Sequence, residues 1–499
     1  MPRTAAQLDR TCIDGCVMNR LQLPTKLEEQ ARSGPAGLRD ALEIWWAGVL
    51  AVTPERLLSS EVRLEANALV VSDDAFDLTG IRRVIVVGAG KASAGMAVAL
   101  YQQCLSRLPK TIDVSGWINA PEESFPSGSK AAGPIHLYAA RPAGVNEPTP
   151  ASLMGTEQIM RRVAECGPAD LCITLLSGGG SALLVSPIEG VTLRDKQLVA
   201  STLAAHGADI RQLNTVRRAL SRVKGGGLAS TCRARHLVTL IISDVLGDPL
   251  ETIASGPTIA SASVSPQAAM DVLQQLDLMH QPDLQNVVSV LRRRAEQVLA
   301  GKSASLRFAP VTNIILANNA SAVDAAGVHA VELGYRYLMQ SSRQLEGDVG
   351  PLAERISHAM EHLSREEQVD CWISGGEPTV KLPVPELRGR GGRNQQLALL
   401  SLLELSKRGW PSDRQKFPDP LLFLSAGTDG EDGPTAAAGA WFDHGTVDRI
   451  AALGLDPKVA ARRADSASFF EHVGGSILSG STGTNVCDLR VALKVRGES

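Results

Sequence analysis

Short apolar runs that end in glycine alternate along the chain with longer segments of helical periodicity. The clearest run, residues 171–176, is expected to be a buried strand, and it stops at Ser177-Gly178-Gly179-Gly180-Ser181. Further runs, each expected to be a strand, lie at residues 84–87, 114–118, 135–139, 237–243, 313–316, 369–373 and 421–425. Between them apolar residues recur every three or four positions, which predicts helices such as 92–104, 151–164, 192–206 and 209–224. This alternation predicts an α/β fold with a mostly parallel sheet.

The length of the chain and one unpatterned stretch predict how it is divided. At 499 residues the chain exceeds what one hydrophobic core usually serves, so we expect two domains or more. Residues 301–309 are polar and lack periodicity, which makes them the best linker. We therefore predict an irregular N-terminal extension (1–34), an N-terminal domain (35–305) and a C-terminal domain (306–499).

The turn that follows residues 171–176 is suited to holding an anion. Three successive glycines remove every Cβ, so backbone N–H groups can close around a ligand oxygen. A tight turn between strand and helix that holds no ligand is the alternative. A second strand, 369–373, leads into Ser374-Gly375-Gly376-Glu377, and this echo favours the ligand.

Basic side chains stand beside two other glycine turns. Lys91 follows Gly88-Ala89-Gly90 at an expected helix start, where a lysine can meet phosphate. The segment Gly389-Arg390-Gly391-Gly392-Arg393-Asn394 sets two guanidinium groups at another helix start. Because arginine pairs with phosphate or carboxylate through two parallel bonds, this segment is the most specific single indication of a ligand.

A basic helix face and three acids complete the candidate chemistry. Arg217 and Lys224 are expected, with Ser221, on one face of the helix 209–224, which could front an anion or be an ordinary solvated face. Asp244 and Asp248 follow the strand 237–243, and Asp429 lies in the acid-rich loop after 421–425. Acids just past strand ends often hold hard cations or sugar hydroxyls. Plain turn residues without a ligand are the alternative.

Composition excludes several classes of partner. A net charge of -3 and an aromatic content of 4% give no basis for binding nucleic acid or an acidic membrane surface. No apolar run approaches the roughly 20 residues that a membrane helix needs. The eight cysteines form no Cys-x-x-Cys pair and favour a reducing compartment. We therefore expect a cytoplasmic protein, and the sequence is compatible with a homo-oligomer.

Together the motifs resemble those of the class II glycerate kinases, the glycerate 2-kinase family with a C-terminal MOFRL domain. The resemblance runs in order over roughly residues 37–489. Its first half rests on Leu176-Ser177-Gly178-Gly179-Gly180-Ser181-Ala182-Leu183, Asn214-Thr215-Val216-Arg217, Lys224-Gly225-Gly226-Gly227-Leu228-Ala229, Ser243-Asp244-Val245-Leu246-Gly247-Asp248 and Ala254-Ser255-Gly256-Pro257-Thr258. Its second half rests on Ser374-Gly375-Gly376-Glu377-Pro378-Thr379, Gly392-Arg393-Asn394-Gln395, Gly427-Thr428-Asp429-Gly430 and Gly480-Ser481-Thr482-Gly483-Thr484-Asn485-Val486. One departure is that Arg141-Pro142-Ala143-Gly144-Val145-Asn146-Glu147 stands where many members carry His-Pro-x-Pro-Asp.

The resemblance implies a larger Rossmann-like domain, a smaller α/β domain with the MOFRL region at about 368–490, and an active site in the cleft between them. It implies ATP, Mg²⁺ and D-glycerate, with the 2-hydroxyl favoured over the 3-hydroxyl as acceptor. Lys91 and Arg393 map to the expected catalytic cations. Substrate or phosphate contacts are expected from Ser177, Gly178, Gly179, Gly180, Ser181, Arg217, Lys224, Glu377 and Asn394. Metal contacts are expected from Asp244, Asp248 and Asp429.

Two other functions stay open at this point. The segment Gly88-Ala89-Gly90-Lys91-Ala92-Ser93 resembles a dinucleotide-binding turn, although Ser93 stands where the third glycine belongs. An NAD(P)H-dependent hydroxypyruvate reductase would use that turn for its cofactor. A non-catalytic protein that binds sugar acids is the third possibility, weakened by the number of charged residues at glycine turns.

Overall fold

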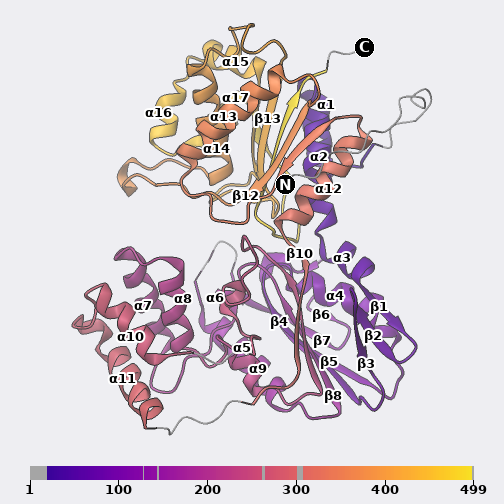
Figure 1. Ribbon diagram of the computed structural model, residues 1–499, viewed down its shortest axis with the longest axis vertical. Coiled ribbons are helices and arrows are strands. Elements are labelled where there is room, and N and C mark those ends of the chain that lie inside the picture. The colour runs from indigo at the N-terminus through magenta and orange to yellow at the C-terminus, as the bar shows by residue number, and fades with distance from the viewer. Residues whose placement is uncertain are drawn as a thin grey trace.

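Two large sheets organise the chain in the computed structural model, which describes residues 20–126, 129–142, 145, 147–260, 264–300 and 307–496. From their places in Figure 1 we call the part built on the first sheet the lower lobe and the part built on the second sheet the upper lobe. The lower sheet consists of β4 (Arg83–Ala89), β5 (Asp113–Pro121), β6 (Ala131–Ala132), β7 (Ile135–Arg141), β8 (Asp170–Leu176), β9 (His236–Ile242) and β10 (Val311–Ala317). Its order is β10-β9-β8-β4-β5-β7-β6, and all neighbours are parallel except β6 with β7. The expected mostly parallel sheet is confirmed in this lobe.

Helices cover both faces of the lower sheet, which explains why its strands are continuous apolar runs. Val84 and Val86 of β4 share one core with α4 (Ser93–Gln103), whereas Ile85 and Val87 share another with α5 (Pro150–Ala164) and α9 (Gly227–Thr231). Successive side chains of a strand point to opposite faces, so each face needs its own apolar set. The strand expected at 171–176 is confirmed as β8, and each of its residues is buried.

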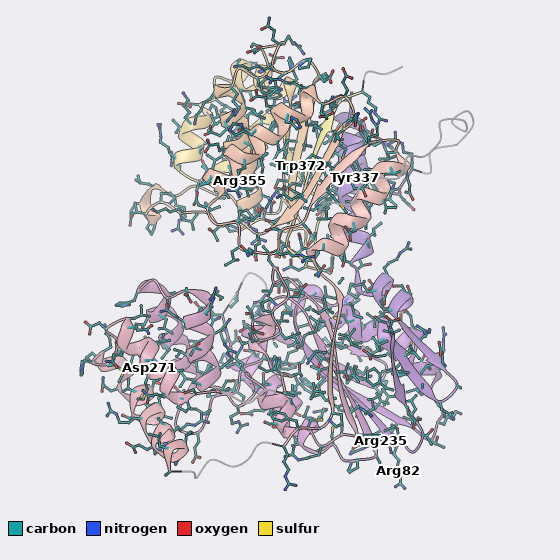
Figure 2. All side chains as sticks on the ribbon, viewed as in Figure 1. Arg82, Arg235, Asp271, Tyr337, Arg355 and Trp372 are labelled. Carbon is teal, nitrogen blue, oxygen red and sulfur yellow. The ribbon has the colours of Figure 1, made fainter. Side chains whose placement is uncertain are left out.

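The lower lobe carries two additions. A small antiparallel sheet follows α3 (Pro54–Glu61) and consists of β1 (Val62–Glu65), β2 (Ala68–Val71) and β3 (Asp74–Asp77). A helical group with its own core consists of α7 (Leu193–Ala205), α8 (Ile210–Ala219), α10 (Pro266–Gln275) and α11 (Gln285–Leu299). Asp271 of α10 marks this group at the lower left of Figure 2.

The upper sheet has the order β11-β12-β16-β13-β14-β15, and only β11 and β12 run parallel. Its strands are β11 (Tyr337–Gln340), β12 (Cys371–Gly376), β13 (Leu421–Gly427), β14 (Gly439–Asp443), β15 (Ser476–Ile477) and β16 (Asp488–Lys494). Its helices after the first two are α12 (Asn319–Glu332), α13 (Val349–Arg365), α14 (Arg393–Lys407), α15 (His444–Leu453), α16 (Pro457–Arg462) and α17 (Ser466–Val473). This sheet is mixed, so only the lower lobe has the parallel architecture.

The N-terminal segment is not an irregular extension as far as the structure describes it. Residues 25–33 form helix α1 (Thr25–Ser33), because Leu27 and Ala31 give it a short apolar face that packs on the upper lobe. The next helix, α2 (Leu38–Ala51), lies beside α12 and the upper sheet, and Trp45 on it is completely buried. The prediction for residues 1–34 is therefore wrong over α1, while residues 1–19 lie outside the described part of the chain.

The chain crosses twice between the lobes. It leaves the upper lobe after α2, builds the lower lobe up to β10, and returns to the upper lobe with α12. The boundary expected between residues 305 and 306 therefore precedes the last strand of the lower sheet. The expected linker 301–309 lies mostly outside the described residues, since 301–306 are not among them.

The carboxyl ends of the parallel strands in the lower sheet face the upper lobe. Arg82 and Arg235 directly precede β4 and β9, and Figure 2 places both at the end of the lower lobe farthest from the upper lobe. Because the strands are parallel, their carboxyl ends and the turns that follow them face the upper lobe.

The structure also describes the state of most cysteines and the character of the helices. The six cysteines within the described residues, Cys104, Cys166, Cys172, Cys232, Cys371 and Cys487, are buried free thiols. Among the described helices, none has both the length and the apolar character needed to cross a bilayer.

Candidate active site

Two glycine turns meet where the strand order of the lower sheet reverses. The chain runs outward from β4 through β5 to β7 and then returns to the other side of β4 as β8. Lys91 follows β4, and its backbone N–H donates to the Gly178 carbonyl after β8 (2.8 Å). Ser177 Oγ accepts from the backbone N–H of Ala92 (2.9 Å). Ligands of open α/β sheets bind at such a reversal, so the topology selects these two turns.

Glycine is required in the second turn for two separate reasons. Gly179 has φ of 75°, a left-handed conformation that side chains disfavour. A Cβ on Gly178 would collide with the carboxylate of Asp244, which follows β9. The turn therefore brings uncharged backbone close to a half-buried acid.

Lys91 reaches across to the upper lobe. Its Nζ lies 3.1 Å from Asp429 Oδ2 and 2.8 Å from Glu431 Oε2, both in the loop after β13. Burial alone would lower the pKa of Lys91, but the two carboxylates outweigh burial and raise it. The lysine is thus a permanent cation held by acids of the opposite lobe.

Arg393 is the first residue of helix α14, and two carboxylates hold its guanidinium group. Its Nε and Nη2 donate to Asp488 Oδ2 (2.8 Å) and Oδ1 (3.0 Å), and its Nη1 donates to Glu377 Oε1 (2.8 Å). Asp488 is fully buried, and it also accepts from Asn394 Nδ2 (2.9 Å). Burial opposes the charge of Arg393, yet these carboxylates raise its pKa. The guanidinium group is therefore fixed in position before any ligand binds.

Buried and half-buried acids concentrate negative charge around the two cations. Burial, reinforced by Glu377, raises the pKa of Asp244 to about 6. Burial also raises the pKa of Asp429. Asp432 accepts from the backbone N–H groups of Asn394 (2.9 Å) and Gln395 (2.8 Å) at the start of α14, and burial raises its pKa to about 7.

A cavity of about 760 Å³ lies between the lobes at these residues. The lower lobe lines it with Lys91, Glu123 and Arg141, and the upper lobe with Arg393 and the loop from Asp429 to Pro434. The two cations predicted from separate halves of the sequence therefore face one space.

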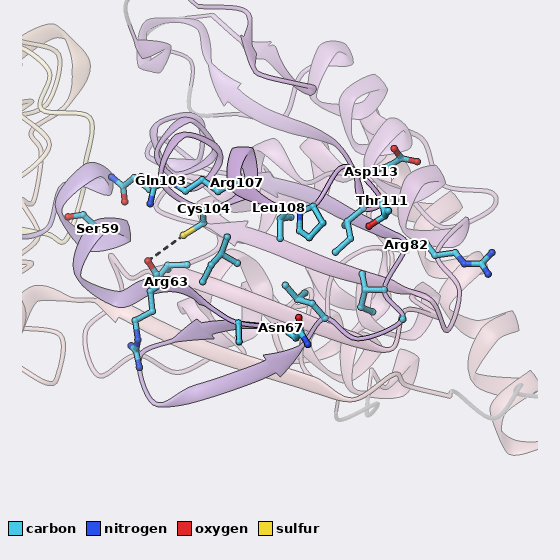
Figure 3. Close-up of a pocket in the computed structure, with 18 residues that line it drawn as sticks. Ser59, Arg63, Asn67, Arg82, Gln103, Cys104, Arg107, Leu108, Thr111 and Asp113 are labelled. Carbon is cyan, nitrogen blue, oxygen red and sulfur yellow. Dashed lines mark hydrogen bonds between the residues drawn. The ribbon is translucent and has the colours of Figure 1, made fainter.

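A larger hollow of about 1200 Å³ lies elsewhere, between the small sheet, the end of α4 and the starts of β4 and β5 (Figure 3). Arg63, Arg82 and Arg107 lie along it, and Asp113 is the one acid among its lining residues. Neither Lys91 nor Arg393 contributes to it. This hollow lies at the starts of β4 and β5, away from the strand ends where Lys91 lies, so the cavity between the lobes is the candidate site although it is smaller.

The other predicted residues divide into two groups. Glu377 and Asn394 lie in the network of Arg393, as described above. Ser181 instead accepts from Lys224, whose Nζ lies 2.7 Å from both Ser181 O and Ser181 Oγ. Asp248 lies apart, since its carboxylate accepts from Asn318 Nδ2.

The predicted helix 209–224 ends early, and this changes where Lys224 lies. Helix α8 stops at Ala219, because Ser221 Oγ accepts from the backbone N–H groups of Val223 (3.3 Å) and Lys224 (3.2 Å) in a turn that follows. Arg217, Ser221 and Lys224 therefore do not share a helix face. Lys224 reaches the Ser177–Ser181 turn from that turn instead.

Several residues of the site were not predicted from the sequence. Asp488 and Glu431 pair with the two cations, yet neither follows from local pattern. Arg141, which ends β7, is buried, lines the cavity, and has an Nε without a hydrogen-bond partner among the described residues. The departure from His-Pro-x-Pro-Asp at Arg141 was the available signal, and residues 143, 144 and 146 of that segment lie outside the described residues.

Two groups of side chains in the described part of the chain could hold a metal ion. Asp244 and Asp429 offer hard oxygen ligands near Lys91, since Lys91 pairs with Asp429 and both of these groups influence the pKa of Asp244. Far from the cavity, in the core behind α5, the thiols of Cys166, Cys172 and Cys232 lie within 4.8 Å of one another. Oxygen donors suit Mg²⁺ and thiols do not, so the two places would attract different ions.

Comparison with known proteins gives consistent results over nearly the whole chain. Residues 40–292 match a domain of unknown function (DUF4147), and residues 370–488 match the MOFRL family. A glycerate kinase of Rattus norvegicus is 35% identical over 92% of this chain and 93% of its own length. A crystal structure of a glycerate kinase from Thermotoga maritima superposes with a TM-score of 0.72 at 29% identity, covering 92% of this chain and 99% of that one. A relative from Agrobacterium vitis whose name proposes a hydroxypyruvate reductase is 36% identical over 82% of this chain and 99% of its own.

Proposed function

The chain belongs to the glycerate kinases that carry a MOFRL domain, and from this we propose that it phosphorylates D-glycerate with MgATP in the cavity between its lobes. We propose 2-phosphoglycerate as the product. The observation that carries the proposal is that Lys91 of one lobe and Arg393 of the other line the same cavity. Phosphoryl transfer needs alignment and charge neutralisation more than covalent help, and two fixed cations supply both.

The cations act on the charge of the transferring group. During transfer the bond between the γ-phosphorus and the bridging oxygen of ADP breaks, a bond to the glycerate hydroxyl oxygen forms, and the hydroxyl proton passes to a carboxylate. Lys91 and Arg393 would stabilise the negative charge on the oxygens of the transferring phosphoryl group. Because acids already hold both cations in place, little reorganisation is needed when the phosphate arrives.

The residues present fit Mg²⁺. Asp244 and Asp429 are carboxylates whose pKa is raised by burial, so a divalent cation would relieve an existing excess of negative charge. We assign the ion to these two residues and leave out Asp248, whose carboxylate is engaged with Asn318. When bound, Mg²⁺ would neutralise charge on the phosphate oxygens of ATP.

The strand order of the lower sheet supports the description of this lobe as Rossmann-like, since its six parallel strands follow the 3-2-1-4-5-6 arrangement of that fold. The position of Lys91 and the Ser177–Ser181 turn at its reversal point supports an active site in the cleft.

We propose that the chain has two domains, the upper one containing the MOFRL match. We also propose a cytoplasmic location, which the free thiols support.

The direct test incubates the full chain with D-glycerate and MgATP. We expect ADP and phosphoglycerate in equal amounts, with the phosphorus resonance identifying the 2-phosphate. L-Glycerate and glycerol serve as controls for handedness and for the carboxylate. Oxidation of NADH by hydroxypyruvate, with no ADP formed from glycerate, would replace this proposal by the reductase. Binding of glycerate with neither reaction would favour the sugar-acid binding protein.

Magnesium dependence is expected to vary with pH. Asp244 has a raised pKa of about 6, so it is ionised above that pH and progressively protonated below it. Since a proton and Mg²⁺ compete for the carboxylate, the apparent Mg²⁺ affinity should fall about tenfold for each unit below pH 6. Initial rates in Mg²⁺ titrations between pH 5 and 8 measure this, and removal of Mg²⁺ with EDTA should abolish turnover. An apparent Mg²⁺ affinity that is constant over this range would contradict the assignment to Asp244.

A further inference from the structure

Three basic side chains gather behind the Ser177–Ser181 turn without an acid. They are Lys196 of α7, Arg217 of α8, and Lys224 in the turn after α8. None of them takes part in an ion pair within the described residues, although most other buried charges of this protein do. Lys196 Nζ donates only to the Leu220 carbonyl (3.0 Å), and the guanidinium group of Arg217 has no hydrogen bond to another described residue.

Such a cluster is costly without an anion. Lys196 and Lys224 are both buried, and taking an ammonium group from water carries a large penalty unless it is paired. Burial, with Arg217 as the second cause, lowers the pKa of Lys196 to about 7. Burial, with Lys196 and Arg217 as further causes, lowers the pKa of Lys224. Each basic group thus destabilises the protonated form of its neighbours. An anion bound among them would stabilise the positive charge on all three.

The cluster lies next to the candidate active site. Lys224 Nζ bonds Ser181, and Ser181 Oγ lies 3.0 Å from Ser255 Oγ, which in turn donates to Asn214 Oδ1 (3.2 Å). Two residues before Ser181, a Cβ on Gly179 would contact the side chain of Lys91. The turn therefore lies between this basic, polar cluster and the cation assigned to phosphate.

We propose that Lys196, Arg217 and Lys224 bind the carboxylate of the substrate, with Ser181 and Arg217, both half-exposed, at its entrance. The proposal rests on the proposed function and adds the part of the site that distinguishes a hydroxy acid from a neutral polyol. It also introduces Lys196, which the motifs did not single out. ATP phosphate is the other source of an anion, and the experiment below separates the two.

The test compares Lys196→Met and Arg217→Met with Arg211→Met, an exposed arginine on the same helix α8. Calorimetry without turnover measures the affinity for D-glycerate alone and for ATP alone. We expect the first two variants to bind D-glycerate at least tenfold more weakly and ATP as the wild type does, while R211M matches the wild type in both. Loss of ATP affinity with unchanged glycerate affinity would overturn the proposal in favour of phosphate, and unchanged affinity for both would overturn it outright.

Proton uptake and thermal stability distinguish a ligand role from a structural one. Because Lys196 is largely neutral at pH 8, binding of D-glycerate should take up protons there, and K196M should take up fewer, as seen in buffers of different ionisation enthalpy. Without ligand, K196M should melt no lower than the wild type at pH 6, where Lys196 is protonated, because the variant then removes a buried charge that no acid pairs with. A large drop in melting temperature with normal glycerate binding would contradict the proposal. Glycerate binding that depends on this cluster in a protein without kinase activity would leave the inference standing while the proposed function fails.

Discussion

Replacing Arg393 with lysine is expected to lower kcat about 10³-fold, the scale on which fixed donors to a transition-state charge act. Lysine keeps the charge and can still pair with Asp488, but it has no planar fork to contact Asp488 and Glu377 at once. The cation would then no longer be held toward the cavity. The measurement is kcat at saturating D-glycerate and MgATP, with circular dichroism to show that the fold persists.

Lysine is the informative substitution because alanine would damage the fold. Asp488 is fully buried, and an unpaired buried carboxylate costs about 3–5 kcal/mol. Arg390 offers the matched control, since it lies on the same glycine-rich turn but pairs with Glu471 at the surface. R390K should keep the wild-type rate. If R393K retains more than a tenth of the wild-type kcat, Arg393 does not act on the transferring phosphate.

Replacing Lys91 with methionine is expected to lower kcat by about 10³-fold or more, because the lower lobe then contributes no cation at the reversal point of its sheet. Methionine has a similar shape, so the change tests charge rather than packing. The melting temperature should change little, since Lys91 and both of its partners, Asp429 and Glu431, are partly exposed and such pairs contribute little to stability.

Two further variants make the Lys91 result specific. K91R keeps the charge and should recover part of the rate, whereas K110M, at an exposed lysine of the same lobe, should behave as the wild type. Single-turnover measurements with bound ATP separate transfer from binding. A wild-type transfer rate in K91M would remove Lys91 from the mechanism.

Features that depend on a single short segment of the chain could be predicted from the sequence. The apolar run 171–176 and its glycines could be predicted as strand and turn, because a strand buried on both faces needs an unbroken apolar run. The cations Lys91 and Arg393 could be predicted because each stands beside glycines in its own short segment.

Properties that depend on distant residues could not be predicted. Lys91 and Glu431 are far apart in the sequence, and only the fold brings them together. Asp488 belongs to no recognisable motif, and its role follows only from its ion pair with Arg393 in the structure. The direction of β16, antiparallel to both β12 and β13, likewise leaves no periodicity in the sequence. Helix α8 ended before its expected limit because the hydroxyl of one serine, Ser221, competes for backbone N–H groups.

The double crossing of the chain sets an order of assembly during synthesis. Helices α1 and α2 leave the ribosome before the lower lobe, but β16, which completes the sheet that covers them, leaves well after it. At roughly 5–20 residues per second the wait lasts tens of seconds, during which the whole lower lobe can fold. Throughout that interval Trp45, whose indole N–H finally donates to the Ala426 carbonyl, has no partner strand. The nascent chain therefore carries an uncovered apolar helix ahead of the lower lobe, and this helix is where we expect a chaperone to bind.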